Sequence, residues 1–187
     1  MVAKISVIIP TYNRAISVCS AVKTVLQQTY SDFEVIVVDD GSTDSTVDKL
    51  SMLRDERLKI YRIEQSGVSF ARNYGFSQSV GGMIAFLDSD DLWHQDKLYK
   101  QIEFHKKNPE LRISQTQEIW IRNGKRVNPK FKHQKPEGFI FEESLHLCTI
   151  SPSSVIMHRQ LFEETGGFDI NLKACEDYDL WLRITPI

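Results

Sequence analysis

Met83-Ile84-Ala85-Phe86-Leu87-Asp88-Ser89-Asp90-Asp91 is the stretch that decides the fold of this chain. Five apolar residues run directly into three carboxylates that lie within four positions. Such an apolar run is typical of a buried strand in a parallel sheet. Because ligands of open α/β sheets bind just beyond the carboxyl ends of the strands, the carboxylates are predicted to lie at a binding site.

The spacing of the acidic residues indicates a bound cation. Asp88 and Asp90 are two positions apart, and on an extended chain their side chains point to the same side. Neighbouring carboxylates repel each other and raise each other's pKa, and a divalent cation removes that repulsion. Mg²⁺ takes one or two carboxylates and completes its shell with water and substrate phosphates. The segment therefore predicts a metal–diphosphate site, and the alternative is an acidic N-terminal cap for the helix that begins near Asp96.

The residues before this stretch alternate between short apolar strands and segments with helical spacing. Strands are predicted at 5–9, 33–38 and 58–63, and helices at about 15–28 and 67–79. A further helix runs through Val47, Leu50 and Leu53, and Thr43 or Asp44 can cap it. Strands and helices that alternate with short connections predict an α/β fold with a mostly parallel, Rossmann-like central sheet.

The second half of the chain mixes helices with short strands. Helices are predicted at about 96–107, 158–165 and 176–184, and strand-like sequence at 111–121 and 154–157. Asn123-Gly124 is a strong signal for a hairpin turn, and Gly166-Gly167 ends the second of these helices. This half is predicted to add a mixed C-terminal part to the parallel sheet.

Composition excludes several classes of protein. The 187 residues suffice for one domain with a real core, and a net charge of −2 gives no global attraction to nucleic acid. The apolar runs are far too short to span a bilayer, and residues 1–5 enter a strand pattern without the architecture of a signal peptide. Cys19, Cys148 and Cys175 are widely spaced, which predicts free thiols in a reducing compartment such as the cytoplasm.

A basic stretch interrupts this balanced composition. Between Ile119 and Pro136 the sequence has no acidic residue. Its basic side chains are Arg122, Lys125, Arg126, Lys130, Lys132 and Lys135, with His133 beside them. Such a loop can attract phosphate or an anionic acceptor, or attach the chain to a membrane or a partner by charge. The alternative is a solvated loop, and no amphipathic helix supports membrane attachment.

Three predicted strands end in polar groups. These ends are Pro10-Thr11-Tyr12-Asn13-Arg14, Asp39-Asp40-Gly41-Ser42 and Asp88-Ser89-Asp90-Asp91. In a doubly wound sheet such ends lie along one edge, so the groups can converge. The sequence has neither Gly-x-Gly-x-x-Gly nor Gly-x-x-x-x-Gly-Lys, so a nucleotide here would be bound by side chains. Taken alone, the second of these segments could also be a turn followed by a helix cap.

Six segments stand in a specific order and spacing. They are Val7-Ile8-Ile9-Pro10-Thr11-Tyr12-Asn13-Arg14, Val37-Val38-Asp39-Asp40-Gly41-Ser42-Thr43-Asp44, Ala71-Arg72-Asn73-Tyr74-Gly75, Phe86-Leu87-Asp88-Ser89-Asp90-Asp91, Gly166-Gly167-Phe168-Asp169 and Glu176-Asp177-Tyr178-Asp179-Leu180-Trp181. Each alone is a weak signal. Together they resemble the family 2 glycosyltransferases, and the resemblance covers almost the entire chain.

The resemblance implies a GT-A fold and an inverting enzyme of cell-envelope polysaccharide biosynthesis. Such an enzyme moves a sugar from a nucleotide-diphosphate donor, here a UDP-sugar, to a saccharide or lipid-linked acceptor, with Mg²⁺ or Mn²⁺ as cofactor. One domain is expected over 1–187, with a nucleotide-binding half at about 1–92 and an acceptor-side half at about 93–187. Family members usually continue further past the segment that contains Asp177, so the acceptor side is expected to be shortened.

Two other functions stay open at this point. The first is a nucleotide-sugar-binding or partner-dependent domain that has little activity alone. The second is a Ca²⁺-binding acidic loop, which ranks last because the carboxylate spacing differs from that of the twelve-residue calcium loop.

The resemblance also implies catalytic and metal-binding roles. Asp177 would be the general base that deprotonates the acceptor hydroxyl, and Glu176 would lie beside it near the acceptor. Asp90 and Asp88 would bind the metal ion, and Asp88 would also contact the ribose or a metal-bound water. The alternative for Glu176 and Asp177 is that they are first-turn acids favoured by the helix dipole.

The nucleotide would be bound by residues from all three strand ends. Asp39 or Asp40 would bind the uracil edge, and adjacent strand residues face opposite ways, so one of the two would do so directly. Arg72 would lie near the base or the diphosphate, or else pair with a surface acid. Tyr178 and Trp181 could belong to the core or form a platform for the acceptor. The implied nucleotide-binding residues are Pro10, Thr11, Tyr12, Arg14, Asp39, Asp40, Arg72, Asp88 and Ser89.

Overall fold

The structure of this chain is a computed structural model that describes residues 4–128, 130 and 133–186. Its strands are β1 Ile5–Thr11, β2 Phe33–Asp40, β3 Leu58–Ile63, β4 Met83–Phe86, β5 Ile113–Gln115, β6 Trp120–Arg122, β7 Lys125–Val127 and β8 Val155–His158. Its helices are α1 Ser17–Leu26, α2 Thr46–Ser51, α3 Val68–Ser77, α4 Lys97–Lys107, α5 Phe141–His146, α6 Arg159–Glu164 and α7 Glu176–Ile184, with a 3₁₀ turn, η2, at Pro152–Ser154. Among the described residues, no helix has both the length and the apolar character that crossing a membrane requires.

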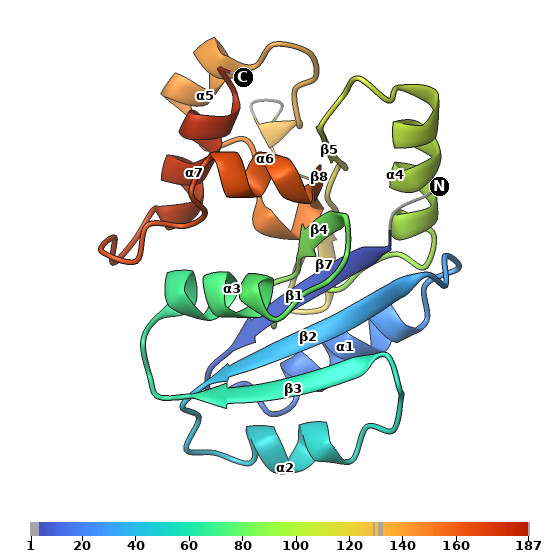
Figure 1. Cartoon of the computed structure of the whole chain (residues 1–187), viewed down its shortest axis with the longest axis vertical. Helices are drawn as coiled ribbons and strands as arrows, with labels where there is room; N and C mark the ends of the chain where they lie inside the picture. Colours follow the sequence, from blue (N-terminus) through green and yellow to red (C-terminus); the bar gives the residue numbers. More distant parts are fainter. Residues whose placement is uncertain (1–3, 129, 131–132, 187) are drawn as a thin grey trace.

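Six strands form one sheet in the order β3-β2-β1-β4-β8-β5. β1 pairs in parallel with β2 and β4, and β2 pairs in parallel with β3, whereas β8 runs antiparallel to β4 and β5. Figure 1 shows β1, β2 and β3 side by side, with the helices and strands of the second half beyond β4. The predicted α/β fold, with a mostly parallel sheet and a mixed C-terminal part, is therefore confirmed.

Helices cover both faces of this sheet. On one face the strands pack against α1, α2 and α4. On the other face they pack against α3, α6 and α7, where Trp181 is only 1% exposed. Trp181 therefore belongs to the core and cannot form a platform for an acceptor. Burial on both faces also explains why the central strands are nearly continuous apolar runs.

The second half differs from the prediction in two places. The strand-like segment 111–121 is two strands, because the chain leaves the large sheet after β5 and β6 pairs with β7 instead. Helix α5 was not predicted, since six residues are too few for a clear helical period. The hairpin turn between β6 and β7 is confirmed, with positive φ angles of 50° at Asn123 and 72° at Gly124.

Gly75 sets the close approach of α3 to the sheet. A Cβ atom at this position would lie 2.6 Å from Cγ2 of Ile8 in β1. Any side chain there would push α3 away from the strands, so the position requires glycine. This packing matters for the site because α3 carries Arg72.

Candidate functional site

The acidic residues after β4 form a turn. The strand ends at Phe86, and the Asp91 N–H donates to the Asp88 carbonyl at 3.0 Å. The expectation that Asp88 and Asp90 point to one side of an extended chain is therefore wrong, because the backbone reverses between them. Each of the two carboxylates instead pairs with an arginine from a different element.

Arg72 joins the acidic turn to the start of α7. Its guanidinium donates to Asp88 Oδ1 at 2.7 Å and to Glu176 Oε1 at 2.8 Å. The arginine is 4% exposed, and its charge lies 4.9 Å from the centre of the Phe168 ring. Two charge-assisted hydrogen bonds and a cation–π contact hold a buried charge that would otherwise be costly. Arg72 thus pairs with two partly buried acids rather than with a surface acid.

Asn73 fixes the ring on which Arg72 lies. Its amide donates to the Phe168 carbonyl at 2.7 Å and accepts the Phe168 N–H at 3.0 Å. A Cβ at Gly167 would lie 2.8 Å from Asn73 Oδ1, so the neighbouring glycine leaves room for this contact. Three of the sequence segments, 71–75, 166–169 and 176–181, are therefore one contact network around Arg72.

The two aspartates at the end of β2 have different surroundings. Asp40 accepts the backbone N–H groups of Ser66 and Gly67 at 2.7 and 2.9 Å, just before α3. Asp39 is fully buried, and its Oδ2 accepts the Ser42 N–H at 3.2 Å with Arg62 Nε at 3.5 Å. Among the described residues, its Oδ1 has no hydrogen-bond partner. Asp40 therefore stabilises a loop, whereas Asp39 has an unused acceptor.

Thr11 lies across from Asp39 on the neighbouring strand. The two residues are register partners of the β1–β2 pair, and they lie on the face of the sheet that α1 and α2 cover. Within the described part of the chain, Thr11 Oγ1 is also buried without a partner. Such atoms are rare because leaving a buried polar group unpaired costs about 1–3 kcal/mol. A hydroxyl donor and a carboxylate oxygen acceptor, both without a hydrogen-bond partner among the described residues, therefore lie on the same face of the sheet at this edge.

Hydrogen bonds join the loop after β1 to the loop after β2. The Asn13 N–H donates to Ser42 Oγ at 2.8 Å, and Asn13 Oδ1 accepts the Thr43 N–H at 2.8 Å. Tyr12, which precedes Asn13, is 40% exposed, and Pro10 is buried within β1. The structure therefore brings the first two strand ends together, as predicted, with Tyr12 at their rim.

Arg14 connects this loop to the acidic turn. Its guanidinium lies 3.0 Å from Asp90 Oδ2, and both side chains are 52% exposed. An exposed pair of this kind contributes about 0–1 kcal/mol, so either partner can exchange it for another ion. Ser89, between the two acidic neighbours, is buried. No group of three His, Cys, Asp or Glu side chains that could hold a metal is found among the described residues.

Asp177 lies in the first turn of α7. Desolvation by burial raises its pKa, the neighbouring Glu176 raises it further, and the Tyr178 N–H and Arg72 offset part of the rise. Its Oδ1 accepts the Tyr178 N–H at 2.8 Å, and the Tyr178 hydroxyl donates to the Ser144 carbonyl at 2.6 Å. A carboxyl in these surroundings is a better proton acceptor than an ordinary aspartate.

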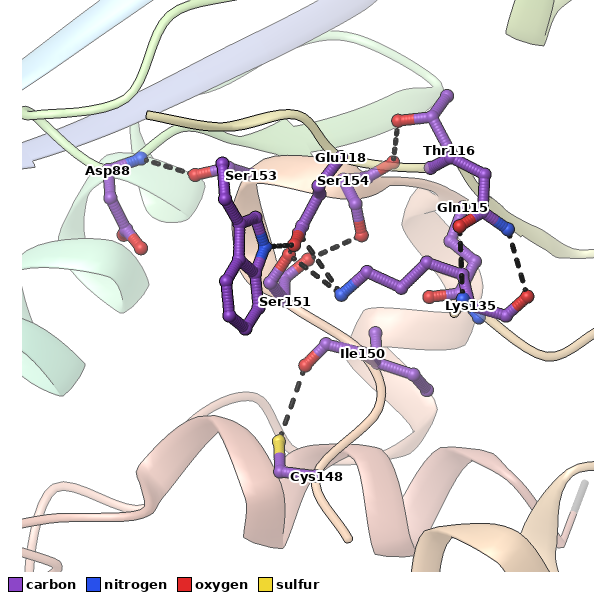
Figure 2. Close-up of polar contacts among 12 residues, drawn as sticks. Asp88, Gln115, Thr116, Glu118, Lys135, Cys148, Ile150, Ser151, Ser153 and Ser154 are labelled. Atoms are coloured by element: carbon purple, nitrogen blue, oxygen red, sulfur yellow. Dashed lines mark hydrogen bonds and ion pairs between the residues drawn. The ribbon is translucent and has the colours of Figure 1, made fainter. Parts of the chain in front are cut away.

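The turn 151–154 supports the acidic turn, and sequence analysis missed it. Ser153 Oγ accepts the Asp88 N–H at 3.0 Å (Figure 2), and the Ser153 carbonyl accepts the Trp93 indole N–H at 2.7 Å. Desolvation by burial raises the pKa of Asp91, the nearby carboxylates raise it further, and Ser153 offsets part of the rise. A Ser-Pro-Ser-Ser run signals only a loop, so nothing in the sequence links it to Asp88.

The base of the basic stretch is tied to the same turn. Figure 2 shows Glu118 between Ser151 and Lys135. Glu118 Oε1 accepts a hydrogen bond from the Ser151 hydroxyl and lies 3.0 Å from Lys135 Nζ. Lys135 is thus used in an ion pair. Arg122, Lys125, Arg126 and Lys130 are exposed, and Lys132 lies outside the described residues.

A separate cavity of about 550 Å³ lies in the second half of the chain. Its lining includes Phe104, Ile113, Val155, Leu161 and Ile184, from α4, β5, β8, α6 and α7. None of the acidic residues considered above lines it. The cavity is therefore an apolar hollow beside the edge strand, away from the strand ends where the candidate site lies.

Comparisons with known proteins agree with the fold. The family model described as Glycosyl transferase family 2 matches residues 6–166. An uncharacterized glycosyltransferase of Rickettsia conorii is 36% identical over 97% of this chain, which spans 30% of that relative. The Escherichia coli protein named UDP-Glc:alpha-D-GlcNAc-diphosphoundecaprenol beta-1,3-glucosyltransferase WfgD is 35% identical over 96% of this chain, which spans 69% of it. The crystal structure of S. aureus TarS in complex with UDP-GlcNAc superposes with a TM-score of 0.80 at 26% identity, over 97% of this chain and 53% of that one.

Proposed function

Because the chain belongs to glycosyl transferase family 2 and has the GT-A fold, we propose that it transfers a sugar from a UDP-sugar to a saccharide or lipid-linked acceptor. The donor half, about residues 1–92, binds the nucleotide, and the acceptor-side half, about 93–187, presents the acceptor hydroxyl. Both halves form one domain. The product belongs to a cell-envelope polysaccharide, and the three free cysteines suit a reducing compartment such as the cytoplasm.

One observation carries this proposal. Arg72 is buried and donates hydrogen bonds both to Asp88, just after β4, and to Glu176, at the start of α7. The acidic turn that would hold the donor diphosphate and the carboxylates that would act on the acceptor therefore meet at one arginine. A transferase needs this arrangement because both substrates must react within one site.

The uracil base would bind at Asp39 and Thr11. The unpaired Oδ1 of Asp39 can accept the imide N–H of uracil, and the Thr11 hydroxyl can donate to a uracil carbonyl. Arg62 lies beside Asp39, and its side chain is 59% exposed, so it can move aside as the base enters. Asp40 is committed to the backbone before α3, which favours Asp39 as the residue that contacts the base directly.

A divalent cation, Mg²⁺ or Mn²⁺, would bind at Asp90. The donor set fits, because Asp90 is half exposed and, among the described residues, its carboxylate pairs with Arg14 in a weak, exposed ion pair. One carboxylate together with substrate phosphates is a common Mg²⁺ site, and Asp88 can hydrogen-bond the ribose or a metal-bound water. When bound, the cation neutralises charge on the departing diphosphate. Arg14, once released from Asp90, can contact the same phosphates.

Asp177 would serve as the general base. Its raised pKa suits a carboxylate that takes the proton of the acceptor hydroxyl as the oxygen attacks the anomeric carbon. The new bond forms as the bond from that carbon to the diphosphate breaks, and the proton stays on Asp177. A single displacement of this kind inverts the configuration of the sugar.

Release of UDP tests the proposal. The purified chain is incubated with UDP-glucose or UDP-GlcNAc, Mn²⁺ and a lipid-linked GlcNAc diphosphate, and free UDP and the glycosylated product are followed together. The proposal predicts acceptor-dependent UDP release that Asp177→Asn removes. A folded chain that binds UDP but forms no product in any combination would contradict the transferase function and support a binding-only domain.

A further inference from the structure

The β6–β7 hairpin is the most exposed part of the described chain that carries a dense charge. Ile119 and Ile121 are 66% and 67% exposed, and Trp120 is 40% exposed. The exposed basic side chains of the hairpin and the residues after it are Arg122, Lys125, Arg126 and Lys130. A two-stranded hairpin is marginal in water by itself, so a surface of this composition gains by contact with another phase or molecule.

The two faces of the hairpin differ. Trp120 packs against His133 with ring centres 5.0 Å apart and the rings tilted, so that face is partly covered by its own chain. Side chains alternate along a strand, which places Ile119 and Ile121 on the opposite face. Arg126 is the register partner of Ile121 and shares this face. The uncovered face thus presents two large apolar side chains with a cation beside them.

The base of the hairpin is fixed close to the candidate site. Gln117 exchanges hydrogen bonds with the backbone of Lys135 at 3.0 and 3.1 Å, which fixes these two residues to each other. Glu118 and Lys135 bind Ser151, in the turn that also holds the Asp88 N–H (Figure 2). Whatever the hairpin touches is therefore held near the acidic turn.

We propose that the uncovered face of the β6–β7 hairpin docks on an anionic lipid bilayer. Arg126 and the neighbouring basic side chains are attracted to the negative surface potential, while the side chains of Ile119 and Ile121 enter the interface between headgroups and acyl chains. The whole chain has a net charge of −2, so attraction to an anionic surface must come from this local patch. The inference rests on the proposed function, because a lipid-linked acceptor, as named for the Escherichia coli relative, is presented at such a surface.

Vesicle binding tests the proposal. The chain is sedimented with vesicles of phosphatidylcholine alone and of phosphatidylcholine mixed with phosphatidylglycerol, at low and at raised salt. Binding is expected to the mixed vesicles and to weaken with salt, since exposed charges are screened. Each basic residue near the surface contributes about fivefold in affinity, so Lys125→Glu with Arg126→Glu is expected to lower it by about 25-fold or more. Ile119→Ser with Ile121→Ser is expected to weaken the binding that remains at raised salt.

A matched control separates the hairpin from net charge. Lys49→Glu with Lys107→Glu makes the same change in charge on α2 and α4, where both lysines are exposed. Its vesicle binding should equal that of the unchanged chain. The proposal would be overturned by an equal loss of vesicle binding in both double variants, or by no binding to the mixed vesicles. Dimerisation of the chain through the hairpin, instead of vesicle binding, would also overturn it. UDP affinity is measured on every variant. If the chain binds UDP but no vesicles, this inference alone fails. A folded chain that binds vesicles but no UDP contradicts the proposed function.

Discussion

The donor half and the acceptor-side half of this molecule are built differently. In the donor half, four parallel strands alternate with α1, α2 and α3, and the apolar residues of β1, β2 and β4 are buried. In the acceptor-side half, β8 and β5 run antiparallel, a separate hairpin extends into solvent, and Phe139 is 99% exposed. The donor half shares both of its main core clusters with the acceptor-side half, and the acceptor-side half also leaves apolar and basic surface uncovered. We therefore expect a nucleotide to bind at the strand ends of the donor half and a larger acceptor or surface to meet the open half.

The largest expected effect comes from replacing Asp177, the proposed base, which tests whether the acceptor-side half carries the catalytic group. Asp177→Asn should lower kcat by about 10²–10⁴-fold, the range for general acid–base catalysis, because the acceptor hydroxyl then keeps its proton. UDP affinity should be unchanged, since Asp177 belongs to the acceptor side. Kinetics with a UDP-sugar and calorimetry with UDP measure the two effects. A variant that retains its turnover would remove Asp177 from the mechanism.

Replacing Arg72 should uncouple the two halves. Arg72→Met leaves Asp88 and Glu176 without their shared cation and should destabilise the chain by about 3–5 kcal/mol, the cost of breaking a buried ion pair. Arg159→Met is the control, because Arg159 also lies over a phenylalanine but donates to neutral partners, the Gly81 carbonyl and the Ser79 hydroxyl, with its acid 3.7 Å away. Denaturant unfolding should show the larger loss for Arg72→Met. Equal losses would mean that the ion pairs of Arg72 add nothing beyond packing and neutral hydrogen bonds.

The donor half can be tested by separating its two neighbouring aspartates. Asp39→Asn should weaken UDP binding by about 10- to 100-fold, as expected when a hydrogen bond to a charged acceptor is lost. Asp40→Asn should instead lower stability, because its carboxylate holds two backbone N–H groups, while the folded variant binds UDP as before. Calorimetry and thermal unfolding on both variants decide the matter. The reverse pattern would move the base contact from Asp39 to Asp40.

The smallest expected effect is a pH-dependent change in stability. The pKa of Asp177 is raised in the folded chain, so the contribution of this group to stability is present below its unfolded pKa and is lost as the pH rises through its folded pKa. Asp177→Asn should therefore raise the Tm slightly at neutral pH, by less than about 1 kcal/mol in stability, and the gain should vanish toward about pH 4. Asp179→Asn, in the same helical turn, should lower the Tm, since Asp179 pairs with Arg183 at 2.6 Å. A lower Tm for Asp177→Asn at neutral pH would contradict the raised pKa.

Sequence patterns predicted the elements whose contacts are local. The strand 58–63 and the helix 176–184 lie where they were expected, because the spacing of apolar residues sets both. The convergence of strand ends also follows from parallel topology alone. The residues 111–121 were misread, because the path of that segment depends on Ser154 and Lys135, which are distant in sequence.

The site residues remain predictions, and the contacts among them could not be foreseen from the sequence. The backbone turn at Asp88–Asp91 could not be foreseen, because an acidic run is compatible with extended and turned chain alike. The pairing of Arg72 with both Asp88 and Glu176 joins residues 16 and 104 positions apart, and no local pattern records it. The choice between Asp39 and Asp40 likewise depended on which carboxylate the loop before α3 uses.

Calorimetric titration of UDP into the folded chain, with and without Mn²⁺, is the measurement to make first. Binding that Mn²⁺ strengthens, and that loses this dependence in Asp90→Ala, is the predicted result, because the cation would link Asp90 to the diphosphate. Absence of UDP binding in both conditions would contradict a UDP site at the carboxyl edge of the sheet. Mn²⁺-dependent binding that persists in Asp90→Ala would contradict the assignment of the metal to Asp90.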